Sequence, residues 1–164
     1  LCTDAKSKAR VKAEEAFSAY DAVVLRLGGI YGPGRSLLDA QRRTASTSEK
    51  PVNRIHVDDI AGALIALADR DVRATTYNVV DDDPAPRSAV SAFADELIGP
   101  SSAKGAAKPS RGTGSKRCRN AKLREVYELL APTYREGLLR IKDADPAIAA
   151  AAYELEPSQA QAGT

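Results

Sequence analysis

The sequence predicts an α/β fold around a parallel sheet, two strands of which are recognisable in the 164-residue chain. Two short runs, residues 22–27 and 75–80, have the composition of strands. The first is continuously apolar, as in a strand whose two faces are both covered by helices. Amphipathic helical patterns precede, separate and follow these runs. This alternation of helix and strand is typical of α/β folds with a parallel sheet.

The first third of the chain predicts a helix, a buried strand and a glycine-rich loop. The helix covers residues 6–20, with an apolar face formed by Ala9, Ala13, Ala16, Phe17 and Tyr20. The strand follows at residues 22–27. The loop then runs from Gly28 to Gly34 and contains four glycines, which let the backbone approach a ligand closely or take positive φ.

The middle of the chain predicts two helices around the second strand. Asp58 and Asp59 stand before an apolar stripe from Ile60 to Ala68, and the two aspartates predict a helix N-cap. The second strand ends in a turn-rich exit, and another amphipathic helix covers residues 87–98. We expect both helices, 60–69 and 87–98, to pack on the sheet. We also expect a short helix over residues 35–43.

The last third divides into an insertion, a small helical part and a tail. Residues 101–115 hold no apolar side chain larger than alanine, so we expect a disordered insertion whose deletion leaves stability unchanged. Two helices follow, with apolar faces formed by Leu123, Val126, Tyr127 and Leu130 and by Tyr134, Leu138 and Ile141. The predicted division is therefore a sheet domain over residues 1–100, an insertion over 101–115, a small helical part over 116–142 and a tail over 143–164.

Composition excludes several classes of function. The net charge of +2 and the lack of aromatics beside the basic cluster around Arg117 argue against nucleic-acid binding. No apolar run is long enough to span a membrane, and no metal-ligand spacing is present. The two cysteines, Cys2 and Cys118, suit a reducing compartment such as the cytoplasm or an organelle stroma. Because the first residue is Leu1 rather than Met, we expect a truncated N-terminus.

Three segments in a fixed order resemble the extended and atypical short-chain dehydrogenase/reductase family, which includes NAD-dependent epimerases and dehydratases. Residues 24–34, VLRLGGIYGPG, resemble the segment after its sixth strand, which passes under the nicotinamide. Residues 53–61, NRIHVDDIA, resemble its HVDDxA helix start, and residues 76–84 resemble its seventh strand. A weaker match over residues 117–138 resembles the small substrate domain. The resemblance implies a partial Rossmann-like sheet, its last two strands and helices, with a remnant of that substrate domain.

The resemblance also implies a ligand set, NAD or NADP with a small-molecule substrate. Its implied cofactor-binding residues are Gly28, Gly29, Ile30 and Arg10, and its implied substrate-binding residues are Arg54 and Tyr31. Typical sugar-nucleotide enzymes carry an arginine four residues before the histidine of this motif. Here Val52 holds that position and Arg54 lies two before His56, so the sugar-nucleotide assignment stays open.

Two family features are missing from these residues. The GxxGxxG turn that holds the dinucleotide pyrophosphate does not occur, so the cofactor site is incomplete. The catalytic Tyr and Lys positions are held by Lys6 and Arg10 in one alignment, or by Asp4 and Lys8 in another. Neither lysine nor aspartate replaces a phenol of similar pKa, so no catalytic residue is assigned.

Each candidate also has a structural explanation. The glycines can serve a tight turn alone, and the basic residues near Arg10 can be the solvated face of a helix. We favour a structural role for His56, the only histidine, at a strand-to-helix junction. Asp81, Asp82 and Asp83 are typical of a solvated loop rather than a metal site.

Three functions therefore remain open. The chain is part of an NAD(P)-dependent oxidoreductase or sugar-nucleotide epimerase/dehydratase. Alternatively, it is a non-catalytic dinucleotide-binding or regulatory member of the same fold, or a fragment with no function alone.

Overall fold

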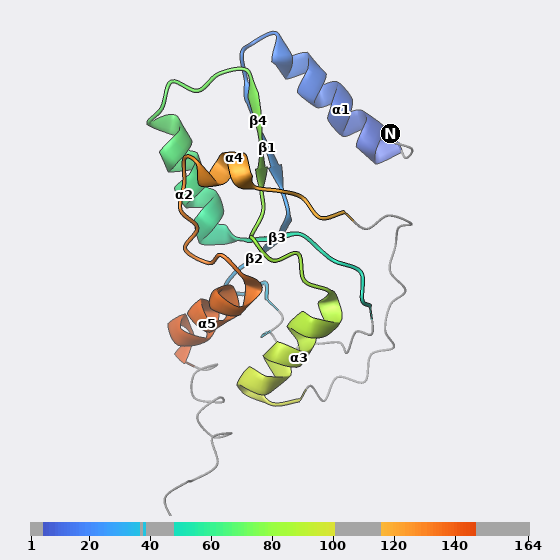
Figure 1. The fold of residues 1–164 in the computed structure, drawn as a ribbon, viewed down its shortest axis with the longest axis vertical. Coiled ribbons are helices and arrows are strands. Elements are labelled where there is room, and N and C mark those ends of the chain that lie inside the picture. The colour runs from blue at the N-terminus through green and yellow to red at the C-terminus, as the bar shows by residue number, and fades with distance from the viewer. Residues whose placement is uncertain (1–4, 37, 39–47, 101–115, 147–164) are drawn as a thin grey trace, which may run out of the picture.

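The computed structural model describes residues 5–36, 38, 48–100 and 116–146 (Figure 1). The remaining residues include the predicted insertion 101–115, most of the helix expected at 35–43 and most of the predicted tail, so these predictions lie outside the described residues. The elements in chain order are α1 (Ala5–Ser18), β1 (Val23–Leu27), β2 (Gly29–Tyr31), β3 (Arg54–His56), α2 (Val57–Ala68), β4 (Thr75–Val79), α3 (Arg87–Ile98), α4 (Ala121–Arg124) and α5 (Tyr134–Ala144).

The two predicted strands pair in parallel, which confirms the predicted α/β architecture. Strand β1 lies beside β4 in a continuous register from Val23 opposite Thr75 to Leu27 opposite Val79. The connection between them contains α2, as expected for a crossover between parallel strands.

A second parallel pair joins β2, which lies within the predicted glycine-rich loop, to β3. Gly28 joins the two sheets: its N–H donates to the Val79 carbonyl at 3.0 Å, and the next N–H, of Gly29, donates to the Asn53 carbonyl at 2.8 Å. A Cβ on Gly28 would lie 3.0 Å from the Arg54 backbone. The glycine therefore permits a close approach between two strands rather than a reversal of the chain.

Helix α2 covers the apolar face of the β1–β4 sheet. Its Ala63 and Leu67 belong to a cluster of buried side chains that also contains Ile55, Tyr77, Val79, Leu123 and Leu129. The predicted N-cap at Asp58 is wrong, because α2 begins at Val57, two residues earlier than an N-cap at Asp58 implies. His56 is the N-cap, and its Nδ1 accepts from the Asp58 N–H at 3.2 Å.

Asp59 holds the connection between α4 and α5 against α2. Its carboxylate is fully buried and accepts from the N–H groups of Leu130 at 2.6 Å and Ala131 at 3.1 Å, and from the Tyr127 hydroxyl at 3.1 Å. These hydrogen bonds offset the cost of removing the carboxylate from water. The helix predicted around Leu123 is correspondingly short, because the chain after α4 turns to meet Asp59.

Helix α3 packs on α5 and on Tyr31, not on the β1–β4 sheet as the sequence predicted. Val90 and Ala94 of α3 share a core cluster with Tyr134, Leu138 and Ile141 of α5. The predicted apolar face of α5 is thus confirmed. A capping box formed by Thr133 and Glu136 begins α5.

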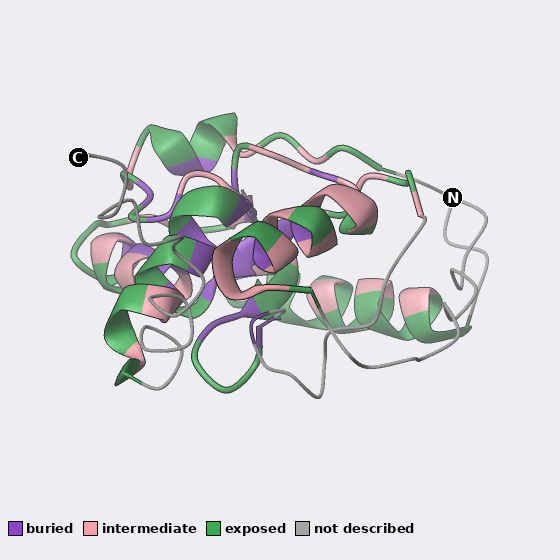
Figure 2. Cartoon of the chain, turned by 90° about the horizontal axis from the view of Figure 1, so that it is seen from below, coloured by how far each residue is buried: buried purple, intermediate pink, exposed green. Residues whose placement is uncertain are grey.

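Helix α1 lies apart from the core and contains no buried residue (Figures 1 and 2). The apolar face predicted for it is therefore not covered by the described residues. Its contact with the sheet is an ion pair from Glu14 to Arg26 of β1, at 2.5 Å.

Three asparagines fasten residues 116–120 to the strands. Asn53 donates to the Lys116 carbonyl and accepts from the Cys118 N–H, and Asn78 of β4 donates to the Arg119 carbonyl. Asn120 donates to the Val80 carbonyl at 2.9 Å and to the Asp82 carboxylate at 2.7 Å. These bonds anchor the small helical part to the ends of β3 and β4.

Candidate functional site

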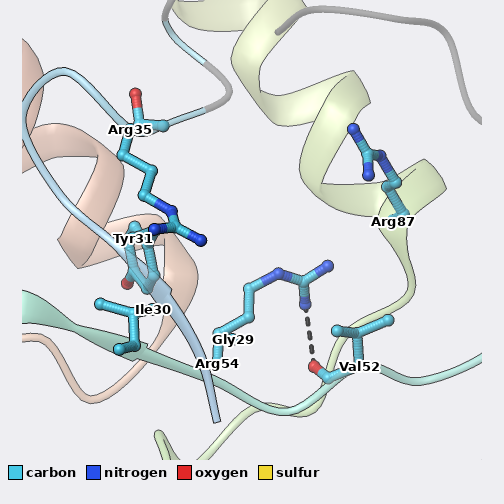
Figure 3. Close-up of a pocket in the computed structure, with 8 residues that line it drawn as sticks. Gly29, Ile30, Tyr31, Arg35, Val52, Arg54 and Arg87 are labelled. Carbon is cyan, nitrogen blue, oxygen red and sulfur yellow. Dashed lines mark hydrogen bonds between the residues drawn. The ribbon is translucent and has the colours of Figure 1, made fainter.

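A cleft of about 360 Å³ opens beside β2, between the loop that follows this strand and the start of α3 (Figure 3). Its lining residues are Gly29, Ile30, Tyr31, Arg35, Ser36, Val52, Arg54 and Arg87. Three of the eight are arginines, and each comes from a different part of the chain. Figure 3 shows the Arg35 and Arg54 side chains reaching into the space that Arg87 borders from α3.

The tertiary structure orients Arg54 through two backbone carbonyls. Its Nη1 donates to the Val52 carbonyl at 2.9 Å and to the Ala85 carbonyl at 2.7 Å, and the residue is only 9% exposed. Burial lowers the pKa of Arg54, and the nearby Asp81 opposes that change. The guanidinium is therefore charged, held in place and desolvated, which are the properties of a preorganised anion-binding group.

A tight turn places Arg35 at the cleft. The Arg35 N–H donates to the Gly32 carbonyl at 3.0 Å, with Pro33 and Gly34 between them. Gly34 has a φ of 68°, so this turn shows the pattern of a type II turn, which needs glycine at that position. Positive φ was predicted for this glycine-rich segment, and Gly34 is the position that takes it.

Arg87 completes the cationic lining from the first residue of α3. Among the described residues, neither Arg35 nor Arg87 forms an ion pair with a carboxylate. A cleft with three guanidinium groups and so few neutralising partners has a strongly positive potential. Arg54 was predicted as a site residue from the sequence, whereas Arg35 and Arg87 were not, because nothing in the sequence around an isolated arginine indicates that it meets distant arginines in the fold.

Asp81 lies behind Arg54 and is 2% exposed, so the prediction of a solvated loop is wrong for this aspartate. Its N–H donates to the Arg54 carbonyl at 2.7 Å, while neither carboxylate oxygen has a hydrogen-bond partner among the described residues. Burial raises the pKa of Asp81 to about 7, although the positive charge of Arg54 acts in the opposite direction. Near physiological pH the Asp81 carboxyl group is therefore divided between its neutral and its charged form.

Tyr31 lines the cleft, but its hydroxyl is buried in the protein interior. The ring meets His56 edge-on with centroids 5.3 Å apart, and the hydroxyl lies where a Cβ on Gly137 would be. Within the described part of the chain that hydroxyl has no hydrogen-bond partner, and burial raises its pKa. A cavity of about 40 Å³ adjoins Tyr31 and Arg54, large enough for an ordered water.

The four predicted cofactor positions are not brought together. Gly29 and Ile30 line the cleft. The N–H groups of Gly28 and Gly29 are already used within the strands, so they are not available as donors to a ligand. Arg10 lies on the exposed helix α1 and does not line the cleft.

His56 is buried at the junction of β3 and α2, with the structural role that the sequence favoured. Burial lowers its pKa, opposed by Asp58, whose carboxylate lies 3.5 Å from Nδ1. The described residues contain no group of histidine, cysteine and acidic side chains that could hold a metal ion. None of the helices described here is long and apolar enough to cross a membrane.

Comparisons with known proteins identify the fold. Neither a protein-family model nor a curated protein sequence matches the chain. Among solved structures, a conserved protein of unknown function from Silicibacter pomeroyi is 32% identical, with a TM-score of 0.75 over 87% of this chain and 57% of that one. A proposed NAD-dependent epimerase/dehydratase from Methylobacillus flagellatus is 31% identical, with a TM-score of 0.72 over 87% of this chain and 54% of that one.

More distant enzymes share the same fold. UDP-glucose 4-epimerase from Thermotoga maritima, solved with UDP-glucose, is 16% identical and has a TM-score of 0.67 over 84% of this chain and 52% of the epimerase. The chain therefore spans just over half the length of the structures it matches.

Fold and relatives together define the class, an α/β protein with parallel sheets whose structure matches Rossmann-like epimerases and dehydratases over about half of their length. The chain corresponds to the C-terminal portion of that fold, which confirms the resemblance to the extended short-chain dehydrogenase/reductases.

Proposed function

We propose that this chain forms the substrate side of an NAD(P)-dependent epimerase, dehydratase or reductase, and that its arginine cleft binds an anionic substrate. The observation that carries the proposal is the convergence of Arg35, Arg54 and Arg87 on one cleft beside Gly29. In this proposal residues 1–100 belong to the NAD(P)-binding domain and residues 116–142 to a small substrate domain.

The chemistry of the cleft favours a phosphate or carboxylate. Guanidinium groups bind these oxyanions through paired, charge-assisted hydrogen bonds, and about 360 Å³ lies within the roughly 300–1,000 Å³ typical of small-molecule sites. Relatives of the same fold have been solved with UDP-glucose and with UDP-glucuronic acid and NAD. A nucleotide sugar or a sugar acid is therefore the substrate class proposed for this cleft.

The position of the cleft also supports a role next to a dinucleotide. By resemblance, the nicotinamide of NAD or NADP lies beside residues 28–34, and Gly29 and Ile30 of that segment line the cleft. The cofactor would supply hydride transfer when bound. This chain's own residues would bind and orient the substrate, because the described residues around the cleft include no exposed phenol to act as general acid or base.

Calorimetric titration of the chain with UDP-glucuronic acid tests the proposal, with glucose as the uncharged comparison. We expect saturable binding of the nucleotide sugar acid and none of glucose. Arg35→Gln and Arg87→Gln should each weaken binding about 10-fold or more, because a hydrogen bond to a charged group contributes about 1.5–3 kcal/mol. Arg73→Gln is the matched control, since Arg73 is 70% exposed and absent from the cleft. Equal effects of all three substitutions would contradict the proposal.

The alternative, a non-catalytic dinucleotide-binding member of the fold, is favoured by the missing Tyr of the catalytic pair. It makes the same prediction for anion binding but predicts no turnover once a complete cofactor site is present.

A further inference from the structure

Asp81 is a buried carboxyl group that lies close to the arginine cleft without lining it. It follows β4, is 2% exposed and is absent from the cleft wall. Neither of its carboxylate oxygens has a hydrogen-bond partner within the described residues. Buried polar groups in native proteins are nearly always hydrogen-bonded, so this exception calls for an explanation.

The backbone places Asp81 directly beside Arg54. The Asp81 N–H donates to the Arg54 carbonyl at 2.7 Å, which holds the end of β4 against β3. In the described part of the chain no ion pair joins the two side chains, and the Arg54 Nη1 donates instead to the carbonyls of Val52 and Ala85. Figure 3 shows the Arg54 side chain directed into the cleft. Asp81 therefore acts on the Arg54 charge through space and leaves the remaining guanidinium N–H groups available to a ligand.

Several other charged or titratable groups act on this pair. They are Tyr31 of β2, Asp82 and Asp83 of the loop after β4, and Arg87 of α3, while Glu136 of α5 acts on Tyr31. Asp82 and Arg87 are exposed and Asp83 is half-buried, whereas Asp81 and Arg54 are buried. Burial raises the pKa of Asp81 to about 7 against the effect of Arg54, and it also raises the pKa of Tyr31, whose hydroxyl stays protonated. The charge of Asp81 therefore changes near neutral pH while its buried neighbour Arg54 stays positive.

We infer that Asp81 is a proton-linked counter-charge of the arginine cleft, which takes up a proton from solvent when an anion binds beside Arg54. This inference rests on the proposed function, because it needs an anion in the cleft. An ionised Asp81 offsets part of the positive charge of Arg54 and weakens anion binding, whereas a neutral Asp81 leaves that charge in full. A bound anion in turn disfavours the ionised form of Asp81 by like-charge repulsion. Anion affinity and proton uptake therefore measure the same coupling from its two sides.

The size of this coupling is about one pKa unit. That is the effect of one anionic charge on a carboxylate about 12 Å away at an effective dielectric constant of about 20. With a pKa of about 7 for Asp81 in the free chain and about 8 in the complex, anion affinity should fall about 6-fold between pH 6.5 and pH 8.5. Near pH 7.5 each bound anion should be accompanied by the uptake of about half a proton.

Calorimetric titration of the full 164-residue chain with UDP-glucuronic acid at pH 6.5, 7.5 and 8.5 tests the inference. The phosphates and the carboxylate of this probe stay ionised over the whole range, so a change in affinity reports on the protein. Titrations at pH 7.5 in Tris and in triethanolamine, two buffers with different heats of ionisation, give the number of protons taken up. We expect the tightest binding at pH 6.5 and net proton uptake at pH 7.5.

Two variants assign the effect to a residue. Asp81→Asn cannot ionise, so it should bind with the same affinity at pH 6.5 and pH 8.5 and without proton uptake. Asp83→Asn is the matched control, because Asp83 also acts on Arg54 but is only half-buried, and this variant should keep the pH dependence. Circular dichroism at each pH shows whether each variant is folded.

The outcomes separate this inference from the proposed function. Saturable binding whose affinity does not change with pH, without proton uptake, would overturn the inference and leave the proposed function intact. The inference would also be overturned if Asp81→Asn kept the pH dependence, or if Asp83→Asn lost it to the same extent. Proton uptake by the unsubstituted chain is a test that holds even if a variant does not fold. A lack of saturable binding at every pH would contradict the proposed function and the inference together.

Discussion

Replacing Asp81 by asparagine should flatten the pH dependence of folding stability. Asp81 is buried, and its carboxylate oxygens have no hydrogen-bond partner in the part of the chain that the structure describes; burial raises its pKa from 3.8 to about 7. The unfolded chain releases this proton near pH 4, whereas the folded chain retains it to about pH 7. Between these values the folded state binds the extra proton, and stability therefore falls as the pH rises.

The magnitude follows from the difference of about 3 in pKa. One pKa unit corresponds to about 1.4 kcal/mol, so Asp81 makes the fold less stable above pH 7 than below pH 4 by about 4 kcal/mol. Between pH 5 and pH 8 the corresponding loss is about 3 kcal/mol. Asp81→Asn cannot ionise, and this contribution should disappear from its stability profile.

Urea unfolding at pH 5, 6, 7 and 8, followed by circular dichroism, measures this contribution. The variant should lose about 3 kcal/mol less than the unsubstituted chain across that range, and should be the more stable of the two at pH 8. Asp71→Asn is the control, because the Asp71 side chain is 83% exposed, and it should keep the original slope. If Asp81→Asn also keeps the original slope, Asp81 is ionised throughout this range and burial does not raise its pKa.

Three other predictions concern single features. Alone, the chain should bind NADH and NADPH very weakly or not at all. The reason is that a few hydrogen bonds of about 0.5–1.5 kcal/mol each do not offset an association cost of about 4–15 kcal/mol. Saturable micromolar binding in calorimetry would show that no further cofactor contacts are needed. Gly137→Ala should lower the unfolding free energy by about 1–3 kcal/mol despite the better helix propensity of alanine, because the new Cβ would overlap the Tyr31 hydroxyl. Adding Tyr31→Phe to this variant should restore part of the lost free energy. Asp59→Ala should cost about 2–4 kcal/mol in the same assay, since it leaves the Leu130 and Ala131 N–H groups unsatisfied; a loss below about 0.5 kcal/mol would show that water replaces the carboxylate.

Local sequence was sufficient where a pattern is short-range. The parallel strands β1 and β4, the apolar face of α5, and the segments that resemble the epimerase/dehydratase fold are all readable from periodicity and motif. The stripe predicted for α2 was wrong at Leu64 and Ile65, which are exposed, because this helix buries Ala63 and Leu67 instead. Such patterns depend on residues that are close in the sequence, because the period of a helix or strand decides which of its side chains lie on the buried face. The direction of each strand followed from the crossover that joins them.

Only the tertiary structure decided the cleft and the second sheet. The pairing of β2 with β3 joins residues about 25 positions apart in the sequence, and the glycines within and beside β2 hide its strand character from any local pattern. Arg35, Arg54 and Arg87 meet because a turn, a strand and a helix start converge, and Asp81 is buried because Arg54 and the chain around Pro132 close over it. The charge of a site and the pKa values within it are properties of the distances between such groups, which no segment of sequence specifies alone.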